Sequence, residues 1–343
     1  MSSRTPHLTR ERFVRVLAVL ALVLLATVIA SALVGSEHID LLRALSGSTN
    51  DNVDALILLR IRLPRALMAV IVGGALAGAG TVLQALLRNP LAEPHLLGVS
   101  GGAAFGGVVA LILGGATGII PAILVPVGAF GGALLTMLVV YRLGTVHGRL
   151  QPYTFLLAGV VCNAFTGALI MALNTLADFF QAHGVLFWLM GSLQAQSYWL
   201  VAASAAYVVI GVLWLLRHSR ELNVLSLGEE SAAQLGVHVA RTRRVSFVVS
   251  SLLVGAAVSV SGMIGFVGLI VPHVTRLLIG ADYRLLLPAS VLVGGTFLVL
   301  ADTVARSAFG PTEIPVGVVT ALCGGPFFIY LLRRGRARHG GLA

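Results

Sequence analysis

The sequence predicts an all-α integral membrane protein of about ten transmembrane helices, and three observations lead to this prediction. Apolar residues make up 57% of the 343 residues and charged residues only 10%, whereas a soluble domain carries about 25% charged residues. The mean hydropathy is +0.97. Apolar runs of about 20 residues, the length that crosses a bilayer as a helix, recur along the chain. Residues 1–343 are therefore expected to form a single transmembrane domain, with its spanning region at about 13–332.

The predicted spans follow one another with mostly short connections. The first follows several arginines and is too long for the core of a signal peptide, so we expect it to be a spanning helix. The eighth is short and contains Pro272, which predicts a break or a tilt. The ten ranges are 13–34, 63–87, 96–114, 119–141, 152–177, 198–217, 244–264, 266–280, 284–304 and 314–332.

The positions of the arginines predict the orientation. All 23 cationic residues are arginine. If both termini are cytoplasmic, eighteen arginines lie in cytoplasmic segments, as the positive-inside rule requires. The five on the outer side are Arg43, Arg60, Arg62, Arg65 and Arg306. The net charge of +10 is thus explained by helix ends, and nucleic-acid binding is not expected.

The absence of lysine excludes a P-loop, whose lysine must reach the phosphates of the nucleotide. If ATP drives this protein, another subunit must bind it. The chain is therefore not expected to be an enzyme by itself.

The long inner loop at about 217–243 is predicted to form two short amphipathic helices. Gly228 and Gly236 punctuate it, and its apolar residues are Leu222, Leu225, Leu227, Leu235 and Val237. These helices could lie on the lipid surface or against a protein. Glu229 and Glu230 would face anionic lipid unfavourably, so a protein partner is favoured.

Five segments carry a more specific pattern. They are RLPRALMAVIVGGALAGAGTVLQALLRNPLAEPHLLGVSGGA (62–103), LNVLSLGEESAAQLGV (222–237), IGFVGLIVPHVTRLLIGADYRLLLP (264–288), ADTVAR (301–306) and EIPVGVVTALCGGPFFIYLL (313–332). In this order they resemble the FecCD or BtuC-type permeases of iron-chelate and cobalamin importers. The resemblance covers about residues 55–334.

The resemblance implies a BtuC-like permease fold, in which an inverted repeat relates helices two to five to helices seven to ten. It also implies four partners besides membrane lipid: a second permease copy, two ATP-binding-cassette ATPase subunits and a periplasmic substrate-binding protein. The protein would lie in the bacterial inner membrane. No cofactor is expected, and no metal, because the chain lacks spacings such as C-x-x-C or H-E-x-x-H.

The resemblance also implies site residues. Docking of the binding protein would use Arg62, Arg65 and Arg306, because a planar guanidinium pairs with a carboxylate through two hydrogen bonds. The alternative is that these arginines anchor helix ends at the head groups. Contact with the ATPase would involve coupling helices at about 221–240, with Leu225, Leu227, Gly228, Glu229, Glu230, Leu235 and Gly236.

The pathway would be lined by the fifth helix. Pro152, Tyr153 and Thr154 would lie near the cytoplasmic gate. Asn163 and Asn174 are the polar residues of this helix, and each could contact substrate or form a hydrogen bond between helices.

The expected function is import of an iron chelate, either a ferric siderophore or haem, with cobalamin as the alternative cargo. The segment GVLFWLMGSLQAQSYW (184–199) occurs in several branches and does not decide between them. An ion-coupled secondary transporter is a weaker alternative, because such proteins place ionisable residues deep inside helices. Here the nearest examples are Glu93, Asp178 and Asp302. An intramembrane hydrolase would need a nucleophile with a partner base, and no such motif is present.

Overall fold

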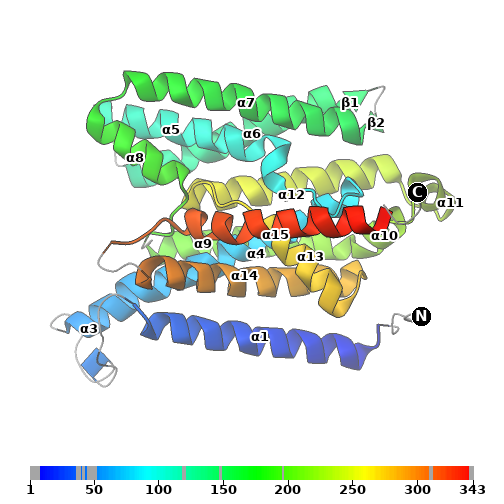
Figure 1. Ribbon diagram of the computed structural model, residues 1–343, viewed down its shortest axis with the longest axis horizontal. Helices are drawn as coiled ribbons and strands as arrows, with labels where there is room; N and C mark the ends of the chain where they lie inside the picture. The colour runs from blue at the N-terminus through cyan, green and yellow to red at the C-terminus, as the bar shows by residue number, and fades with distance from the viewer. Residues whose placement is uncertain are drawn as a thin grey trace.

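The computed structural model describes residues 8–35, 40, 43–44, 52–117, 121–146, 149–194, 197–308 and 312–339, and within them the chain is almost entirely helical (Figure 1). A two-stranded antiparallel hairpin, β1 (Thr145–Val146) and β2 (Arg149–Leu150), is the exception in this part of the chain. The longer helices are α1 (Arg10–Leu33), α4 (Leu63–Leu86), α5 (Val99–Thr117), α6 (Pro121–Gly144), α7 (Pro152–Leu176), α9 (Tyr198–Arg217), α12 (Val239–Ser261), α13 (Val267–Ile279), α14 (Tyr283–Ser307) and α15 (Val316–His339).

Each of the ten predicted spans coincides with one of these helices, so the all-α prediction is confirmed. Seven of the described helical stretches are long and apolar enough to cross a membrane. α13 has only 13 residues, which is about 20 Å at 1.5 Å per residue and less than the roughly 30 Å hydrocarbon core. The break expected at Pro272 does not occur there, because the helix continues through it. The interruption lies before the helix, at 262–266.

The sequence did not predict several short elements. They are α3 (Val53–Leu56) and the π-helix η1 (Ile57–Arg62), which extend α4, the 3-10 turn η2 (Pro94–Leu97), and α8 (Phe179–Leu189). α8 has 11 residues, too few to register as a span.

The central element is α4, most of whose surface is covered by other helices. In its most apolar window 83% of the residues are buried, against 11% for α1. Gly73 lies so close to α14 that an added Cβ would come within 2.2 Å of the Gly294 carbonyl oxygen. At Gly80 the Gly268 carbonyl oxygen of α13 would be 2.0 Å away. Lipid provides no hydrophobic drive between helices, so small residues that allow close backbone approach are the expected packing device.

We expect Gly80→Ala to destabilise the protein, because neither backbone can withdraw from the added methyl group without separating α4 from α13. A cost of about 1–3 kcal/mol is typical of such overpacking. Thermal unfolding in detergent micelles would measure it. Gly131→Ala in α6 is the matched control, since an added Cβ there meets nothing within 4 Å. Equal unfolding temperatures for the two variants would contradict the role of this contact.

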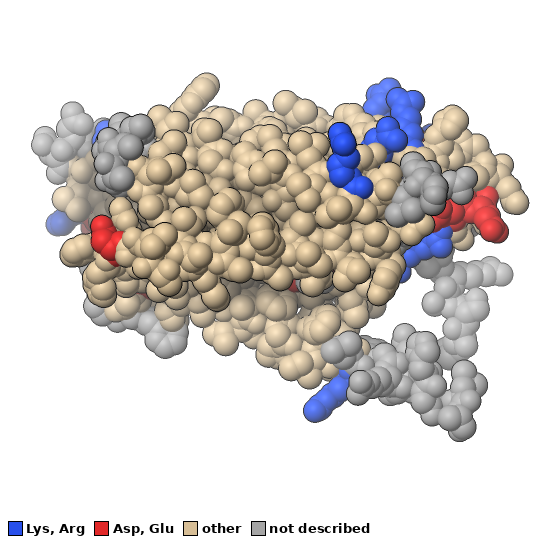
Figure 2. Space-filling view, turned by 90° about the horizontal axis from the view of Figure 1, so that it is seen from above, with Lys and Arg blue, Asp and Glu red and all other residues tan. Residues whose placement is uncertain are grey.

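The two ends of the molecule differ in what they carry. The start of α1 and the end of α15 lie at the same end of the molecule as β1–β2, α10 (Ser219–Leu225) and α11 (Glu229–Gln234) (Figure 1). We call this the terminal end. α3 lies at the opposite end, which we call the α3 end. Figure 2 shows a broad uncharged surface between charged side chains at the two ends, as a bilayer-spanning protein requires.

Candidate functional site

Three arginines and two carboxylates meet at the α3 end, and we call them the arginine cluster: Arg62, Arg65, Asp302, Arg306 and Glu313. Arg65 of α4 binds Asp302 of α14 through its Nε, at 3.1 and 3.0 Å from the two carboxylate oxygens, and through one terminal nitrogen at 3.0 Å. The other terminal nitrogen of Arg65 donates to Glu313, in the segment before α15, at 2.7 Å. Arg65 thus joins three parts of the chain.

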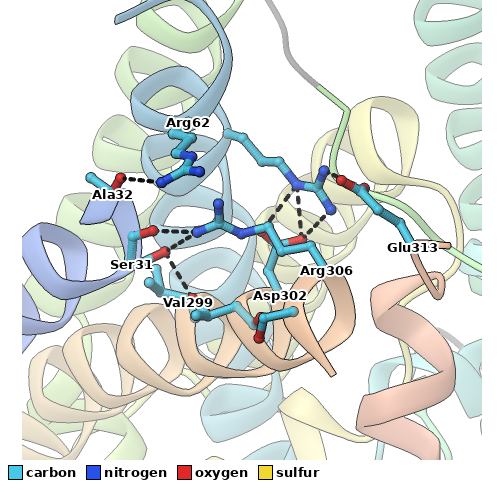
Figure 3. Close-up of polar contacts among 10 residues, drawn as sticks. Ser31, Ala32, Arg62, Val299, Asp302, Arg306 and Glu313 are labelled. Carbon is cyan, nitrogen blue, oxygen red and sulfur yellow. Dashed lines mark hydrogen bonds and ion pairs between the residues drawn. The ribbon is translucent and has the colours of Figure 1, made fainter. Parts of the chain in front are cut away.

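Arg62 and Arg306 turn toward the end of α1 (Figure 3). Arg62 donates to the carbonyl oxygens of Ala32 and Leu33, both at 3.1 Å. Arg306 donates to the carbonyl and, at 2.8 Å, to the hydroxyl oxygen of Ser31. The last carbonyls of a helix lack partners within the helix and favour cations. Both side chains are only about 5% exposed, so the two arginines cap α1 inside the molecule.

The π-helix η1, directly before α4, contributes to the orientation of these arginines. η1 has the wider π pattern, in which each N–H bonds to the carbonyl five residues earlier. Pro64 has no N–H to give to the Leu59 carbonyl. The Tyr198 hydroxyl of α9 donates to that carbonyl instead, so a neighbouring helix satisfies the free carbonyl and stabilises η1.

A cavity of about 220 Å³ opens beside the cluster. Its lining includes Arg62, Arg65, Arg306 and Glu313, together with Gly35, Ile57 and Ile61. A cavity lined by three guanidinium groups and one carboxylate is suited to an anionic group. The three arginines predicted as docking residues are therefore brought together, whereas Arg60 is exposed and outside this lining.

We expect Asp302→Asn to destabilise the protein, because Asp302 is 1% exposed and lies against both Arg65 and Arg306. Removing one partner of a buried ion pair costs about 3–5 kcal/mol. The unfolding temperature in micelles would show the loss. Glu11→Gln breaks the exposed pair with Arg15 and should change stability little; a similar loss in both variants would contradict the buried role of Asp302.

The predicted pair of short helices at the terminal end is present as α10 and α11, with Gly228 and Gly236 at φ 129° and 82° between and after them. α10 is firmly attached. Leu222 and Leu225 are fully buried. The Asn223 side chain donates to Asp282 at 2.7 Å and accepts from the Tyr283 backbone N–H at 2.8 Å.

Asp282 therefore joins α10 to the start of α14. Its hydrogen bonds with Arg284 are the main reason that its pKa falls to about 2, and the bond from Asn223 adds to them. Because the pKa is lowered in the folded protein, the carboxylate stabilises this junction above about pH 4. That contribution is lost as the pH falls toward 2.

α11 is attached by fewer contacts. Glu229 binds Arg243 of α12 at 2.6 Å and lies 4.0 Å from Arg88, which follows α4. Leu227 and Leu235 are 70% and 65% exposed. A cavity of about 690 Å³ lies beside α11, lined by residues that include Arg88, Gly228, Glu229, Glu230 and Arg243.

The predicted coupling residues thus divide into two groups. Leu227, Glu230 and Leu235 are exposed. Leu225 is buried in the core, and Glu229 is engaged by arginines of its own chain. Leu225 therefore offers no surface to a partner. Glu229 is still exposed, with 47% of its side chain accessible, so its coupling role stays a prediction.

The predicted pathway helix is α7, which Pro152 begins. Tyr153 is 80% exposed, and the Thr154 hydroxyl lies 3.3 Å from the Gln151 side chain. The Asn163 side chain donates to the His95 carbonyl oxygen of η2 at 2.6 Å, so it forms a bond between helical segments, one of the two alternatives. The Oδ1 of Asn174 is buried and accepts no hydrogen bond from the described residues.

Asp302, Glu313, Arg88 and Arg243 were not predicted as site residues. Only Asp302 left a signal in the sequence, because it stands four residues before Arg306 and such pairs meet on one helix face. The other contacts join distant segments. Among the described residues, His, Cys, Asp and Glu form no group of three that could hold a metal ion.

Comparison with known proteins agrees with this architecture. Residues 22–334 match the family model of the FecCD transport family. The haemin transport permease HmuU of Yersinia pestis is 43% identical over 95% of this chain and 97% of its own length. The cobalamin import permease BtuC of Halobacterium salinarum is 47% identical over 80% of this chain and 72% of its own length.

A solved structure shows the same fold. It is an inward-facing conformation of an ABC transporter of the metal-chelate type, with a TM-score of 0.80 and 34% identity over 94% of this chain and 99% of the other. The predicted permease fold and family are both confirmed. The chain belongs to the FecCD transport family.

Proposed function

We propose that this chain forms the membrane pathway of an ATP-driven importer of an iron chelate, either a ferric siderophore or haem. The observation that carries the proposal is the match over nearly the full length, in sequence to a haemin permease and in fold to a transporter of the metal-chelate type. Cobalamin is the second candidate, because a cobalamin permease is 47% identical. ATP hydrolysis is assigned to separate subunits, since the sequence has no lysine for a P-loop.

The orientation follows from the arginines. We place the terminal end in the cytoplasm, in agreement with the positive-inside rule, and the α3 end outside. Both termini are then cytoplasmic in the inner membrane.

The arginine cluster is proposed as the docking site of a periplasmic binding protein. Arg62 and Arg306 are buried, so a partner would reach them only through the 220 Å³ cavity. Arg65 has the best access, because its side chain is 12% exposed and binds the half-exposed Glu313.

The terminal end is proposed to contact the ATPase. Leu227 and Leu235 offer apolar surface beyond the membrane, and Glu230 lies beside them. Force applied to α11 would reach α12 and the end of α4 through Glu229, which binds Arg243 and lies close to Arg88. Two ATPase subunits and two permease copies are expected.

A second copy would also complete the pathway. α7 leaves large apolar side chains exposed, among them Tyr153, Leu157, Val161 and Phe165. In a dimer, α7 of each copy would face a central pathway, with Asn174 as a polar residue near its outer end and residues 152–154 near the gate.

The importer is tested by reconstitution. The chain would be co-expressed with its neighbouring ATPase and binding-protein genes and purified into liposomes. We expect uptake of a ferric siderophore or haem that requires both ATP and the binding protein. Uptake of cyanocobalamin alone would favour the second candidate. Solute movement by the chain alone under an ion gradient would contradict the proposal.

A pair of variants tests the coupling role. Leu227→Asp removes apolar contact worth about 1.5–3 kcal/mol if fully buried, so ATPase affinity should fall roughly 10- to 100-fold. Glu229→Gln should leave ATPase affinity nearly unchanged and lower transport per ATP hydrolysed, because the side chain faces Arg243. Pull-down and vesicle uptake measure the two effects. Normal assembly and uptake in both variants would contradict the assignment.

A further inference from the structure

We infer that Glu313 occupies the docking site when no binding protein is present, and that it must give way to a carboxylate of the partner. The inference rests on the proposed function and adds a regulatory residue to the same site. It starts from the two carboxylates of the arginine cluster, which are held in different ways.

Asp302 is fixed in place. It is 1% exposed, it belongs to a helix, and it accepts three hydrogen bonds from Arg65. Its second oxygen also lies 3.6 Å from Nε of Arg306. Moving Asp302 out of the cluster would leave buried guanidinium groups without a counter-charge, which is costly.

Glu313 is held less firmly. Its side chain is 50% exposed and it lies in a non-helical segment before α15. Its carboxylate accepts from Arg65 at 2.7 Å. A rotation about its side-chain bonds would expose that carboxylate to water and free one terminal nitrogen of Arg65.

The position of Glu313 determines whether a carboxylate of the partner can bind the Arg65 guanidinium. The same cavity is lined by Arg65, Arg62, Arg306 and Glu313, so an incoming carboxylate meets Glu313 at the guanidinium that is most accessible. Arg65 would stay oriented during the exchange, because its bonds to Asp302 do not involve the nitrogen that Glu313 occupies. Glu313 thus acts as an internal competitor that weakens docking and allows the partner to leave after delivery.

The test is the affinity of the permease–ATPase complex for the binding protein. The probe is the purified binding protein encoded with the transporter, and the complex is held in nanodiscs. Partly exposed ion pairs contribute modestly to binding, and charge-assisted ones somewhat more. We therefore expect Glu313→Gln to lower the Kd roughly 3- to 10-fold, mainly through slower dissociation. Glu313→Asp keeps the charge on a shorter side chain and should give a smaller gain.

Two controls separate competition from general electrostatics. Asp178→Asn removes one negative charge at the start of α8, a helix that Figure 1 draws at the α3 end, and asparagine still caps α8. This variant should leave the Kd nearly unchanged. In an Arg65→Gln background, Glu313→Gln should have no effect, because the competition acts through Arg65.

A weaker or unchanged affinity in Glu313→Gln would overturn the inference while leaving the importer intact. So would an equal gain in Asp178→Asn, or a gain that persists without Arg65. If the unmodified complex does not bind the binding protein at all, the proposed function fails, and the inference fails with it.

Discussion

Close backbone contact around α4 is the constraint on which the rest of the structure depends. In lipid, apolar side chains gain little by leaving the solvent, so helices associate through packing and hydrogen bonds. Gly73 and Gly80 let α14 and α13 approach α4 at distances that a Cβ would forbid. Helices that cannot separate fix the positions of their ends. The polar sites at both ends of the molecule follow from that fixed geometry.

At the α3 end, ion pairs and hydrogen bonds offset the free-energy cost of burying charged side chains. Asp302 lies between Arg65 and Arg306, and Arg62 and Arg306 take up the last carbonyls of α1. The sequence leaves two roles open for these arginines, anchoring of helix ends at the lipid head groups and recognition of a partner. The structure shows a third role, in which these arginines hold helices together inside the molecule, while the cavity beside them leaves room for recognition. One set of side chains can serve both purposes, since each guanidinium has five donors.

The terminal end combines a firm part with a looser one. α10 is joined to α14 through Asn223 and Asp282. α11 is flanked by the exposed Leu227 and Leu235 and is held by the buried Ala232 and the ion pair of Glu229 with Arg243. A transporter needs two states that different partners favour. A rigid base next to a weakly attached helix allows force on α11 to move the helices behind it without unfolding the segment.

The sequence by itself determined the number and order of the long helices, the two short helices after α9, and the family, because length, hydropathy and motifs are local properties. It also pointed to Arg62, Arg65 and Arg306 as a group. It missed α8, which is too short for a spanning window, and it included the buried Leu225 among the residues expected to contact the ATPase. Only the tertiary structure decided that Leu225 lies in the core and that the Glu313 carboxylate accepts a hydrogen bond from Arg65. Those facts depend on contacts between segments up to 248 residues apart, and neither hydropathy nor spacing along the chain encodes which distant groups meet.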